Sequence, residues 1–362
     1  MRAERFGAPR AQAMIDTAAL CDNFCRIQSA AGVRVIAVVK ANAYGHGLSL
    51  AVPAFLAGGC DFFAVAELCE GEAVRALAPS AEILVLGYTP PEDAARLAAA
   101  SLTQCVFSLP YAVSLAAAAR AAGVTLPVHL KIDGGMCRLG LAPDAGELGR
   151  IFSQEGLCVC GVFTHFPNAA FDPRGTQRAI QRFAALRERL PKGLVFHAAA
   201  SDALPLESAR FDGVRIGLAL YGYGTQRALL SLTPALSLQA PVVQIHTVPR
   251  GTPVGYGGRF VTARRSRIGT LPIGYADGLS TACARMPVTL LHAGVRFQAP
   301  LCGRICMDHC MIDLTDTPGV VGDNICLVED AERVARYTNG IPYEVLTAIG
   351  TRVRRQRKGE GR

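Results

Sequence analysis

The sequence contains no tryptophan and no apolar run that approaches the roughly 18 to 20 residues of a membrane-spanning helix. Met1–Gln12 carries charges and lacks the apolar centre of an export signal, so we expect a cytoplasmic protein. Thirteen cysteines, an odd number without such a signal, favour reduced and mostly buried thiols over disulfides. Hydrophobic residues make up 51% of the 362 residues, which is enough for two globular domains.

The sequence also lacks the patterns expected of a metal site or a nucleic-acid surface. Cys302, Cys306 and Cys310 are separated by three residues each, which matches no usual zinc spacing, so we predict no metal. The net charge is +8, but Arg352–Arg362 holds six Lys or Arg and one Glu, which is +5 of that total. Since no basic segment outside this tail is interleaved with aromatic residues, nucleic-acid binding has no support. We expect the tail to be a solvated, frayed terminus.

Lys40 follows a run that is typical of a buried parallel strand. Val33–Val39 is rich in β-branched residues and almost uncharged, and the turn after Lys40, with Gly45 and Gly47, leads into an amphipathic helix over Leu48–Leu56. Burial disfavours the charged form of an amine, and a neutral amine is required for a Schiff base with a carbonyl compound. The alternative is an ordinary strand–helix unit whose lysine only ends a strand.

Seven further apolar segments alternate with helix-like segments after this unit. The eight predicted strands are Val33–Val39, Asp61–Val65, Ile83–Gly87, Gln104–Phe107, Leu126–Ile132, Cys158–Thr164, Leu194–Ala198 and Gly213–Gly217. Helical segments between them include Leu68–Leu77, Glu92–Ala100, Tyr111–Ala122 and Thr176–Leu190. This alternation predicts an α/β fold with a (β/α)8 barrel, whose functional residues lie at the carboxyl ends of the strands.

The pattern changes to turn-rich, alternating β sequence from about Pro234. Strand-like stretches there are Leu236–Val248, Ser266–Ile273, Val288–Phe297 and Asn324–Val328. The sequence therefore predicts a barrel domain over residues 14–234 and a mostly antiparallel β domain over 235–362. We expect residues 1–13 to pair with the second domain.

The residues at the ends of the predicted barrel strands form a chemically coherent set. They are Lys40, Lys131, Asp133, His165, Ser201 and Arg215–Gly217. The hydroxyl of Ser201 and the backbone of Gly217 suit a phosphate site, which barrels often build after their last two strands. A phosphate held there can place an aromatic aldehyde against Lys40, with Arg215 at a ring nitrogen and His165 on the ring face. A phosphorylated aldehyde with a pyridine ring is pyridoxal 5′-phosphate (PLP).

A series of motifs along the chain resembles the alanine racemase family. They are VVKANAYGHG, KIDGGMCRLG, THF, VRIGLALYG, VGYGGRF, PIGYADG, GRICMD and PYE, in this order from about Met14 to Arg354. The resemblance implies a PLP-dependent isomerase that interconverts L- and D-alanine and supplies D-alanine for the bacterial cell wall. It also implies a head-to-tail homodimer in which each active site is completed by the partner's C-terminal domain.

By this resemblance Lys40 and Tyr256 are the two catalytic bases, on opposite faces of the substrate carbon. Racemisation needs such a pair, because one base tends to return the proton to the side it left. A tyrosine ordinarily titrates near pH 10, and the resemblance links Tyr256 through His165 to Arg215. Since a guanidinium does not give its proton to the pyridine nitrogen, the ring stays a weaker electron sink, which suppresses transamination.

The resemblance assigns the other site residues as well. Tyr44, Ser201, Gly217 and Tyr343 correspond to phosphate contacts. Arg138 and Met307 correspond to contacts with the substrate carboxylate, Met307 from the partner chain through its backbone. Lys131, often carbamylated in the family, orients Arg138, and Asp308 has a supporting role.

Several positions depart from the family pattern. Gly134 replaces a usual Thr, and Ala200 replaces an Asn. Ala170 and Thr281 stand where an acid and an arginine are common, and the usual tyrosine near the C-terminal end is missing at Arg352–Gln356. We interpret these changes as altering efficiency or substrate access.

Three other functions stay open from the sequence. One is a racemase of serine or of a broad range of amino acids, against which the bulky ring of Tyr343 argues. A second is a non-catalytic PLP-binding protein, but such proteins resemble only the first half of the chain. A third is a PLP-dependent decarboxylase, whose G-P-x-C-x-x-x-D arrangement is absent.

Overall fold

The computed structural model describes residues 10–143 and 145–360, which divide into two compact units. The barrel unit consists of Ala18–Ala43 and Leu48–Thr233. The C-terminal unit takes the chain up to Thr17, the short segment Tyr44–Gly47, and the chain from Pro234 on. No helix among the described residues is both long enough and apolar enough to cross a membrane.

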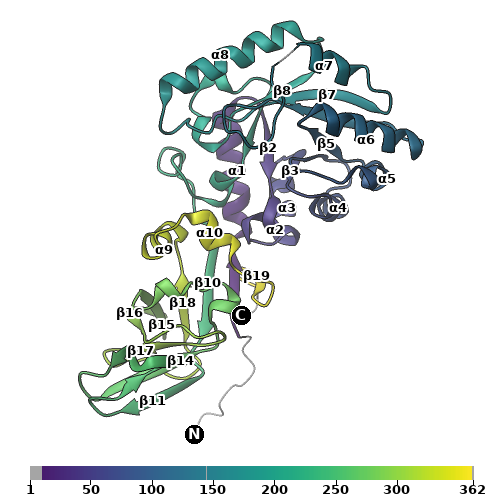
Figure 1. The fold of residues 1–362 in the computed structure, drawn as a ribbon. Helices are drawn as coiled ribbons and strands as arrows, with labels where there is room; N and C mark the ends of the chain where they lie inside the picture. The colour runs from purple at the N-terminus through teal and green to yellow at the C-terminus, as the bar shows by residue number, and fades with distance from the viewer. Residues whose placement is uncertain (1–9, 144, 361–362) are drawn as a thin grey trace. The chain divides into compact units, whose positions relative to one another are not determined.

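The barrel unit is a closed ring of eight parallel strands in sequence order, which confirms the predicted fold (Figure 1). The strands are β2 (Arg34–Val38), β3 (Phe62–Val65), β4 (Glu82–Val85), β5 (Thr103–Val106), β6 (Leu126–Lys131), β7 (Leu157–Phe163), β8 (Val195–His197) and β9 (Gly213–Ile216). The last strand pairs with the first, with Ala37 of β2 opposite Ile216 of β9. Strands β3 and β9 are buried along their whole length, as expected for strands covered on both faces.

One helix precedes the first barrel strand, and others lie between most of the following strands. They are α1 (Thr17–Ala31), α3 (Leu48–Ala57), α4 (Leu68–Leu77), α5 (Ala94–Ala99), α6 (Leu109–Ala121), α7 (Ala145–Phe152) and α8 (Pro173–Arg189). Helix α6 begins after Ser108, whose hydroxyl accepts a hydrogen bond from the N–H of Tyr111, and α8 begins after Asp172, which caps the N–H of Gly175. Each cap satisfies a backbone donor that the first turn leaves free.

The C-terminal unit is built on a nine-stranded, mostly antiparallel sheet, with the order β11-β14-β17-β16-β15-β18-β10-β1-β19. Its strands are β1 (Gln12–Ile15), β10 (Leu236–Pro241), β11 (Gln244–Val248), β14 (Ser266–Leu271), β15 (Pro287–His292), β16 (Val295–Cys302), β17 (Cys310–Asp313), β18 (Asn324–Val328) and β19 (Arg354–Arg357). A small ribbon of β12 (Pro253–Val254) and β13 (Phe260–Val261) and two helices, α9 (Ala331–Thr338) and α10 (Pro342–Thr347), complete the unit. Strand β1 pairs with β10 and β19, while residues 1–9 lie outside the described part of the chain.

Two strand-like stretches of the sequence each contain a pair of strands. The stretch Leu236–Val248 divides into β10 and β11 at Pro241, which has no N–H to continue a ladder. The stretch Val288–Phe297 is a hairpin, because Ala293 and Gly294 both have positive φ, at 48° and 81°, and turn the chain between β15 and β16. Two such residues form the tight turn that matches the twist of antiparallel strands.

The prediction of a frayed basic tail is wrong for Arg354–Arg357. These residues form β19, an edge strand whose backbone pairs in parallel with β1. Arg355 is half-buried, and its guanidinium donates hydrogen bonds to backbone carbonyls. Because its charge is solvated by these carbonyls, the strand does not have to be exposed to water. Only residues 361 and 362 of the tail lie outside the described residues.

The thirteen cysteines are all free thiols, as expected, but the expectation that most are buried is wrong. Six are buried, and the others are partly or fully exposed. Cys25 on α1 and Cys158 on β7 are exposed because each lies on the solvent side of its element. In the described part of the chain no group of three or more His, Cys, Asp or Glu is arranged to hold a metal ion.

Candidate active site

Lys40 begins a left-handed helical turn at the carboxyl end of β2. The next four residues, Ala41–Tyr44, have φ between 50° and 55° although none is glycine. A left-handed conformation costs about 1–2 kcal/mol for each such residue, so this turn persists only because its surroundings hold it. The carboxylate of Glu70 accepts from the N–H of Ala41 at 2.6 Å, and the side chain of Asn42 accepts from the N–H of Leu48 at 2.9 Å. The strained backbone therefore fixes the position of Lys40 at the end of the barrel strand.

The surroundings of Lys40 favour its neutral amine. The residue keeps solvent exposure in the single chain, yet the protein around it desolvates the ammonium, and this desolvation lowers the pKa of Lys40. The charge of Arg138 lowers that pKa further, whereas the carboxylate of Glu70 opposes the shift. A lysine with a lowered pKa carries more of the neutral amine that condenses with a carbonyl group.

Arg215 on β9 lies inside the barrel with every side-chain hydrogen bond directed to uncharged groups. It donates to His197 Nδ1 at 2.9 Å and to the carbonyls of His197, Thr164 and Ala198 at 3.0, 2.6 and 3.1 Å. No carboxylate forms an ion pair with it within the described ranges. Burial lowers the pKa of Arg215 to about 10, which still leaves it charged at neutral pH. The guanidinium is thus a fixed, uncompensated cation at the active end of β9.

Two buried histidines, His197 and His129, form a hydrogen-bonded chain that ends at Arg215. His197 Nε2 lies 2.9 Å from Nδ1 of His129, on β6. Since arginine has only donors, His197 must accept through Nδ1, so its proton is on Nε2 and is donated to His129. Desolvation, reinforced by the charge of Arg215, lowers the pKa of His129 to about 4 and that of His197 well below its ordinary value. Both rings are therefore neutral and hold the guanidinium in one orientation.

Ser201 and Gly217 follow β8 and β9, the last two strands of the barrel. Ser201 is buried and begins a 3-10 turn after β8, and Gly217 precedes another, Leu218–Tyr221, after β9. Because β8, β9 and β2 are consecutive in the ring, these two residues and Lys40 share one sector of the barrel's carboxyl end. A hydroxyl and the free N–H groups at the start of helical turns suit a phosphate.

His165 and Lys131 lie at the ends of β7 and β6. Desolvation, with Arg215 and Arg138 adding to it, lowers the pKa of His165 to about 4, so its ring is neutral. Lys131 is buried with Nζ 5.8 Å from the centroid of Phe163, and desolvation lowers its pKa too. Among the described residues, the side-chain hydrogen bonds of Arg215 go to His197, Thr164 and Ala198, so the link from Tyr256 through His165 to Arg215 stays a prediction.

The departure at Gly134 has a steric explanation. A Cβ atom at this position would lie 1.9 Å from the carbonyl oxygen of His165, so no larger residue fits without a backbone shift. Asp133, next to it, accepts from the N–H groups of Gly135 and Met136 and orders the start of the loop that carries Arg138. Arg138 itself is exposed.

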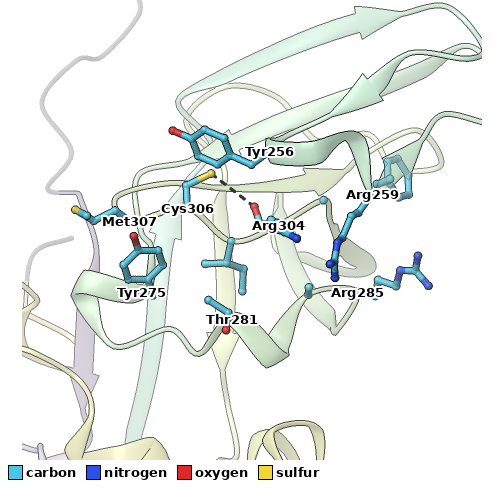
Figure 2. A pocket seen from close by; sticks show the side chains of 12 residues that line it. Tyr256, Arg259, Tyr275, Thr281, Arg285, Arg304, Cys306 and Met307 are labelled. Carbon is cyan, nitrogen blue, oxygen red and sulfur yellow. Dashed lines mark hydrogen bonds between the residues drawn. The ribbon is translucent and has the colours of Figure 1, made fainter.

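Tyr256 and Met307 line a cavity of about 740 Å³ in the C-terminal unit (Figure 2). Tyr256 stands between Gly255 and Gly257, both with φ of 71°, and this sharp turn leaves its side chain 71% exposed. Met307 is 54% exposed. Thr281, one of the departures, also lines the cavity. Figure 2 shows the rings of Tyr256 and Tyr275 on either side of Cys306 and Met307.

The Met307 loop is fixed by backbone and ionic contacts. The carbonyl of Met307 accepts from the N–H of Ala276 at 3.0 Å, and a Cβ atom on Gly274 would lie 2.3 Å from the same oxygen. Arg352 donates to the carboxylate of Asp308 at 2.6 Å, and this contact lowers the pKa of Asp308. Asp308 therefore ties the Met307 loop to the C-terminal end of the chain.

Tyr44 and Tyr343 contact each other in the C-terminal unit. Their ring centroids are 5.8 Å apart and the rings are tilted by 46°. Tyr44 is buried, whereas Tyr343 at the start of α10 is 39% exposed.

The structure thus brings the predicted site residues together in two groups. The barrel unit gathers Lys40, Lys131, Arg138, His165, Ser201, Arg215 and Gly217 at the carboxyl ends of its strands. The C-terminal unit carries Tyr44, Tyr256, Met307, Asp308 and Tyr343. Sequence reasoning missed His129, His197 and Glu70. A histidine inside each of two apolar strand segments was the available signal for the first two; for Glu70 the sequence offered none.

These features define a two-domain barrel enzyme centred on a lysine amine beside a buried arginine. Family models for the alanine racemase N-terminal domain and C-terminal domain match residues 15–225 and 235–357. The chain belongs to the alanine racemase family, whose members are isomerases that use PLP.

Individual relatives agree over nearly the full length. The chain is 35% identical to the alanine racemase of Thermodesulfovibrio yellowstonii, over 95% of this chain and 97% of the relative. Among solved structures, alanine racemase of Clostridium difficile superposes with a TM-score of 0.90 at 31% identity, covering 98% of this chain and 97% of the other. Alanine racemase of Streptomyces lavendulae gives 0.89 at 32% identity, covering 97% and 98%.

Proposed function

We propose that the chain is a PLP-dependent racemase that interconverts L-alanine and D-alanine. The observation that carries this proposal is the pairing, at one barrel end, of Lys40 with a lowered pKa and Arg215 without a carboxylate partner. The names of the relatives support alanine as the substrate. PLP, when bound, withdraws electrons from the substrate and loosens the hydrogen on its α-carbon.

The residues at the barrel end fit PLP by their chemistry. Lys40 provides the amine that holds the aldehyde, and Ser201 and Gly217 provide donors for the phosphate. Arg215, being charged at neutral pH, would donate a hydrogen bond to the pyridine nitrogen without giving up its proton. The neutral ring of His165 would pack against the face of the cofactor ring. Tyr44 and Tyr343 supply two further phenols for the phosphate.

Two residues move the proton. Lys40 removes or returns the α-hydrogen on the face of the D-isomer, and Tyr256 does so on the face of the L-isomer. Two opposed bases are needed because the product is the mirror image of the substrate. The glycines on both sides of Tyr256 support this role, since the turn they form leaves its side chain exposed at the cavity.

The site is shared between two copies of the chain in a head-to-tail homodimer. The support is that Tyr256 and Met307 are exposed at a cavity of the C-terminal unit, although a base and a substrate contact must be shielded from water to work well. Met307 contributes its backbone to the carboxylate of the substrate bound in the partner's barrel. Asp308 holds that loop through Arg352.

Arg138 binds the substrate carboxylate, and Lys131 positions it as a carbamate. The lowered pKa of Lys131 supports this, because only a neutral amine reacts with carbon dioxide. A carbamate would also reverse a local repulsion, since Lys131 as a cation lies near the charges of Arg138 and Arg215.

In the cell the product would be D-alanine for the bacterial cell wall, made in the cytoplasm. The bulky ring of Tyr343 favours alanine over serine or larger amino acids.

The test is to incubate the purified chain with PLP and each L-amino acid and to measure the D-isomer by chiral chromatography. We expect D-alanine as the main product. Lys40→Ala should lose the absorbance of lysine-bound PLP together with activity, by at least about a thousandfold. Lys192→Ala, which changes a lysine that is mostly exposed, is the matched control. PLP trapped by borohydride on another lysine would contradict the assignment.

A further inference from the structure

We propose that Arg355 is a positioning residue for the phosphate end of the cofactor, acting through the Tyr44–Gly47 segment. This inference rests on the proposed function, in which Tyr44 and Tyr343 contact the phosphate. All contacts that carry it lie within the C-terminal unit.

The guanidinium of Arg355 joins two separate pieces of backbone. Its Nε donates to the carbonyl of Gly45 at 3.0 Å. Its two terminal nitrogens donate to the carbonyls of Ile349, Gly350 and Val353 at 2.5, 2.5 and 2.8 Å. The last three residues form the connection between α10 and β19, so one side chain fixes the end of α10 to the residue that follows Tyr44.

The geometry on the Tyr44 side leaves little freedom. Gly45 has φ of 79°, and a Cβ atom on it would lie 2.1 Å from the carbonyl oxygen of Leu346 at the end of α10. A Cβ atom on Gly47, with φ of 93°, would lie 3.4 Å from Cγ of Arg355. The aliphatic part of Arg355 therefore covers Gly47 while its guanidinium binds Gly45.

The same helix carries the second phenol. Tyr343 lies at the start of α10, and its ring contacts that of Tyr44. Arg355 thus sets the spacing between the two phenols that the proposed function directs to one phosphate. Burial lowers the pKa of Arg355, which is the cost of placing this cation among carbonyls. A planar fork with five donors can serve four carbonyls, whereas a lysine ammonium has only three donors on one atom.

The experiment compares the binding of PLP with that of pyridoxal, which lacks the phosphate. Full-length chains carrying Arg355→Met, Arg355→Lys, Tyr44→Phe and the double change Tyr44→Phe with Arg355→Met are titrated spectroscopically with each compound. Arg354→Met is the control, since Arg354 is the exposed neighbour on the same strand. Thermal unfolding reports the stability of each variant.

Arg355→Met should weaken PLP binding by about tenfold or more, the size expected for loss of charge-assisted hydrogen bonds, and leave pyridoxal binding unchanged. The double variant should bind PLP no more weakly than the weaker single variant, because both changes remove the same contact. Arg355→Lys keeps the charge and the aliphatic part of the side chain, so it should weaken PLP binding less and also leave pyridoxal binding unchanged. If Arg355→Met does not fold, the result for Arg355→Lys tests the inference.

Equal PLP binding by the Arg355 and Arg354 variants would overturn the inference, as would an equal loss of PLP and pyridoxal binding. If the unmodified chain forms no lysine-bound PLP, the proposed function itself fails, which is a different result.

Discussion

The barrel unit and the C-terminal unit present their site residues in opposite states. In the barrel, Arg215 is 6% exposed and His197 is completely buried, and each has defined hydrogen-bond partners. In the C-terminal unit, Tyr256 is 71% exposed and Met307 is 54% exposed. The barrel's residues are held in place within one chain, whereas the C-terminal residues lie on a surface.

This difference indicates that the two units have different requirements in the reaction. A group that stabilises charge must be held rigidly, because reorganising it during the reaction would cost free energy. The buried cation of Arg215 with its two neutral histidines meets that condition without another chain. A base on an open surface cannot work in this way without another chain, since water competes for its proton. The C-terminal half therefore needs a second surface, which the proposed dimer supplies.

Replacing Tyr256 with Phe should abolish proton transfer by the C-terminal unit while leaving proton transfer by Lys40 of the barrel unit intact. The ring and its packing remain and only the hydroxyl is lost, so racemisation should fall by roughly 100- to 10,000-fold. In heavy water the variant should still exchange the α-hydrogen of D-alanine through Lys40, with little exchange into L-alanine. Nuclear magnetic resonance measures both exchanges. Tyr337→Phe, an exposed tyrosine on α9, is the control. Rapid exchange of L-alanine without exchange of D-alanine would show that the two faces are assigned the wrong way round.

Mixing the inactive variants Lys40→Ala and Tyr256→Phe should restore activity, because an intact barrel site then meets an intact Tyr256. In a shared site, a heterodimer of Lys40→Ala and Tyr256→Phe has one intact site, so an equal mixture should regain about a quarter of the original activity. Activity is measured after subunit exchange, which mass spectrometry of tagged chains verifies. If exchange is complete and no activity returns, each site is built within one chain.

The sequence predicted the barrel half more completely than the C-terminal half for a physical reason. Lys40, His165 and Arg215 each follow or end a run of apolar residues, and parallel strands bring such ends to one edge. No comparable rule places Tyr256, whose position depends on two glycines with positive φ in the loop between the short paired strands β12 and β13. Its role came from family resemblance alone.

Some features lay beyond sequence reasoning in both units. The contact between His129 and His197 joins residues 68 positions apart, which only the closed barrel brings together. The turn of four left-handed residues after Lys40 contains no glycine, and only Asn42 is of a type that favours this conformation, so residue type gave little indication of it. In the C-terminal unit, the charge of the basic tail indicated exposure, whereas backbone carbonyls satisfy Arg355 inside the fold.

The two buried histidines should make the barrel unit sensitive to acid. The folded pKa of His129 is about 4, below its ordinary value of 6.5, so the unfolded chain takes up a proton first as the pH falls. Stability is then lost between about pH 6.5 and pH 4, by up to about 3 kcal/mol for this residue. His129→Gln cannot titrate and should show a flatter dependence of unfolding free energy on pH, measured by urea denaturation. His246→Gln, an exposed histidine on β11, should keep the original slope. Equal slopes for all three chains would exclude this source of acid sensitivity.

The smallest expected effect concerns the tuning of Lys40 by Glu70 in the barrel unit. The Glu70 carboxylate accepts from the N–H groups of Ala41 and Ala66, and its charge raises the pKa of Lys40 against the larger effect of desolvation. Glu70→Gln removes the charge, so the pKa of Lys40 should move further down. The rate at which Lys40 captures PLP follows the fraction of neutral amine, and its midpoint on a pH profile should therefore shift to lower pH. Glu72→Gln, which changes an acid paired with Arg96 on the outside of α4, should leave that midpoint in place. A shift to higher pH in Glu70→Gln would mean that the carboxylate acts on Lys40 through the strained turn and not through its charge.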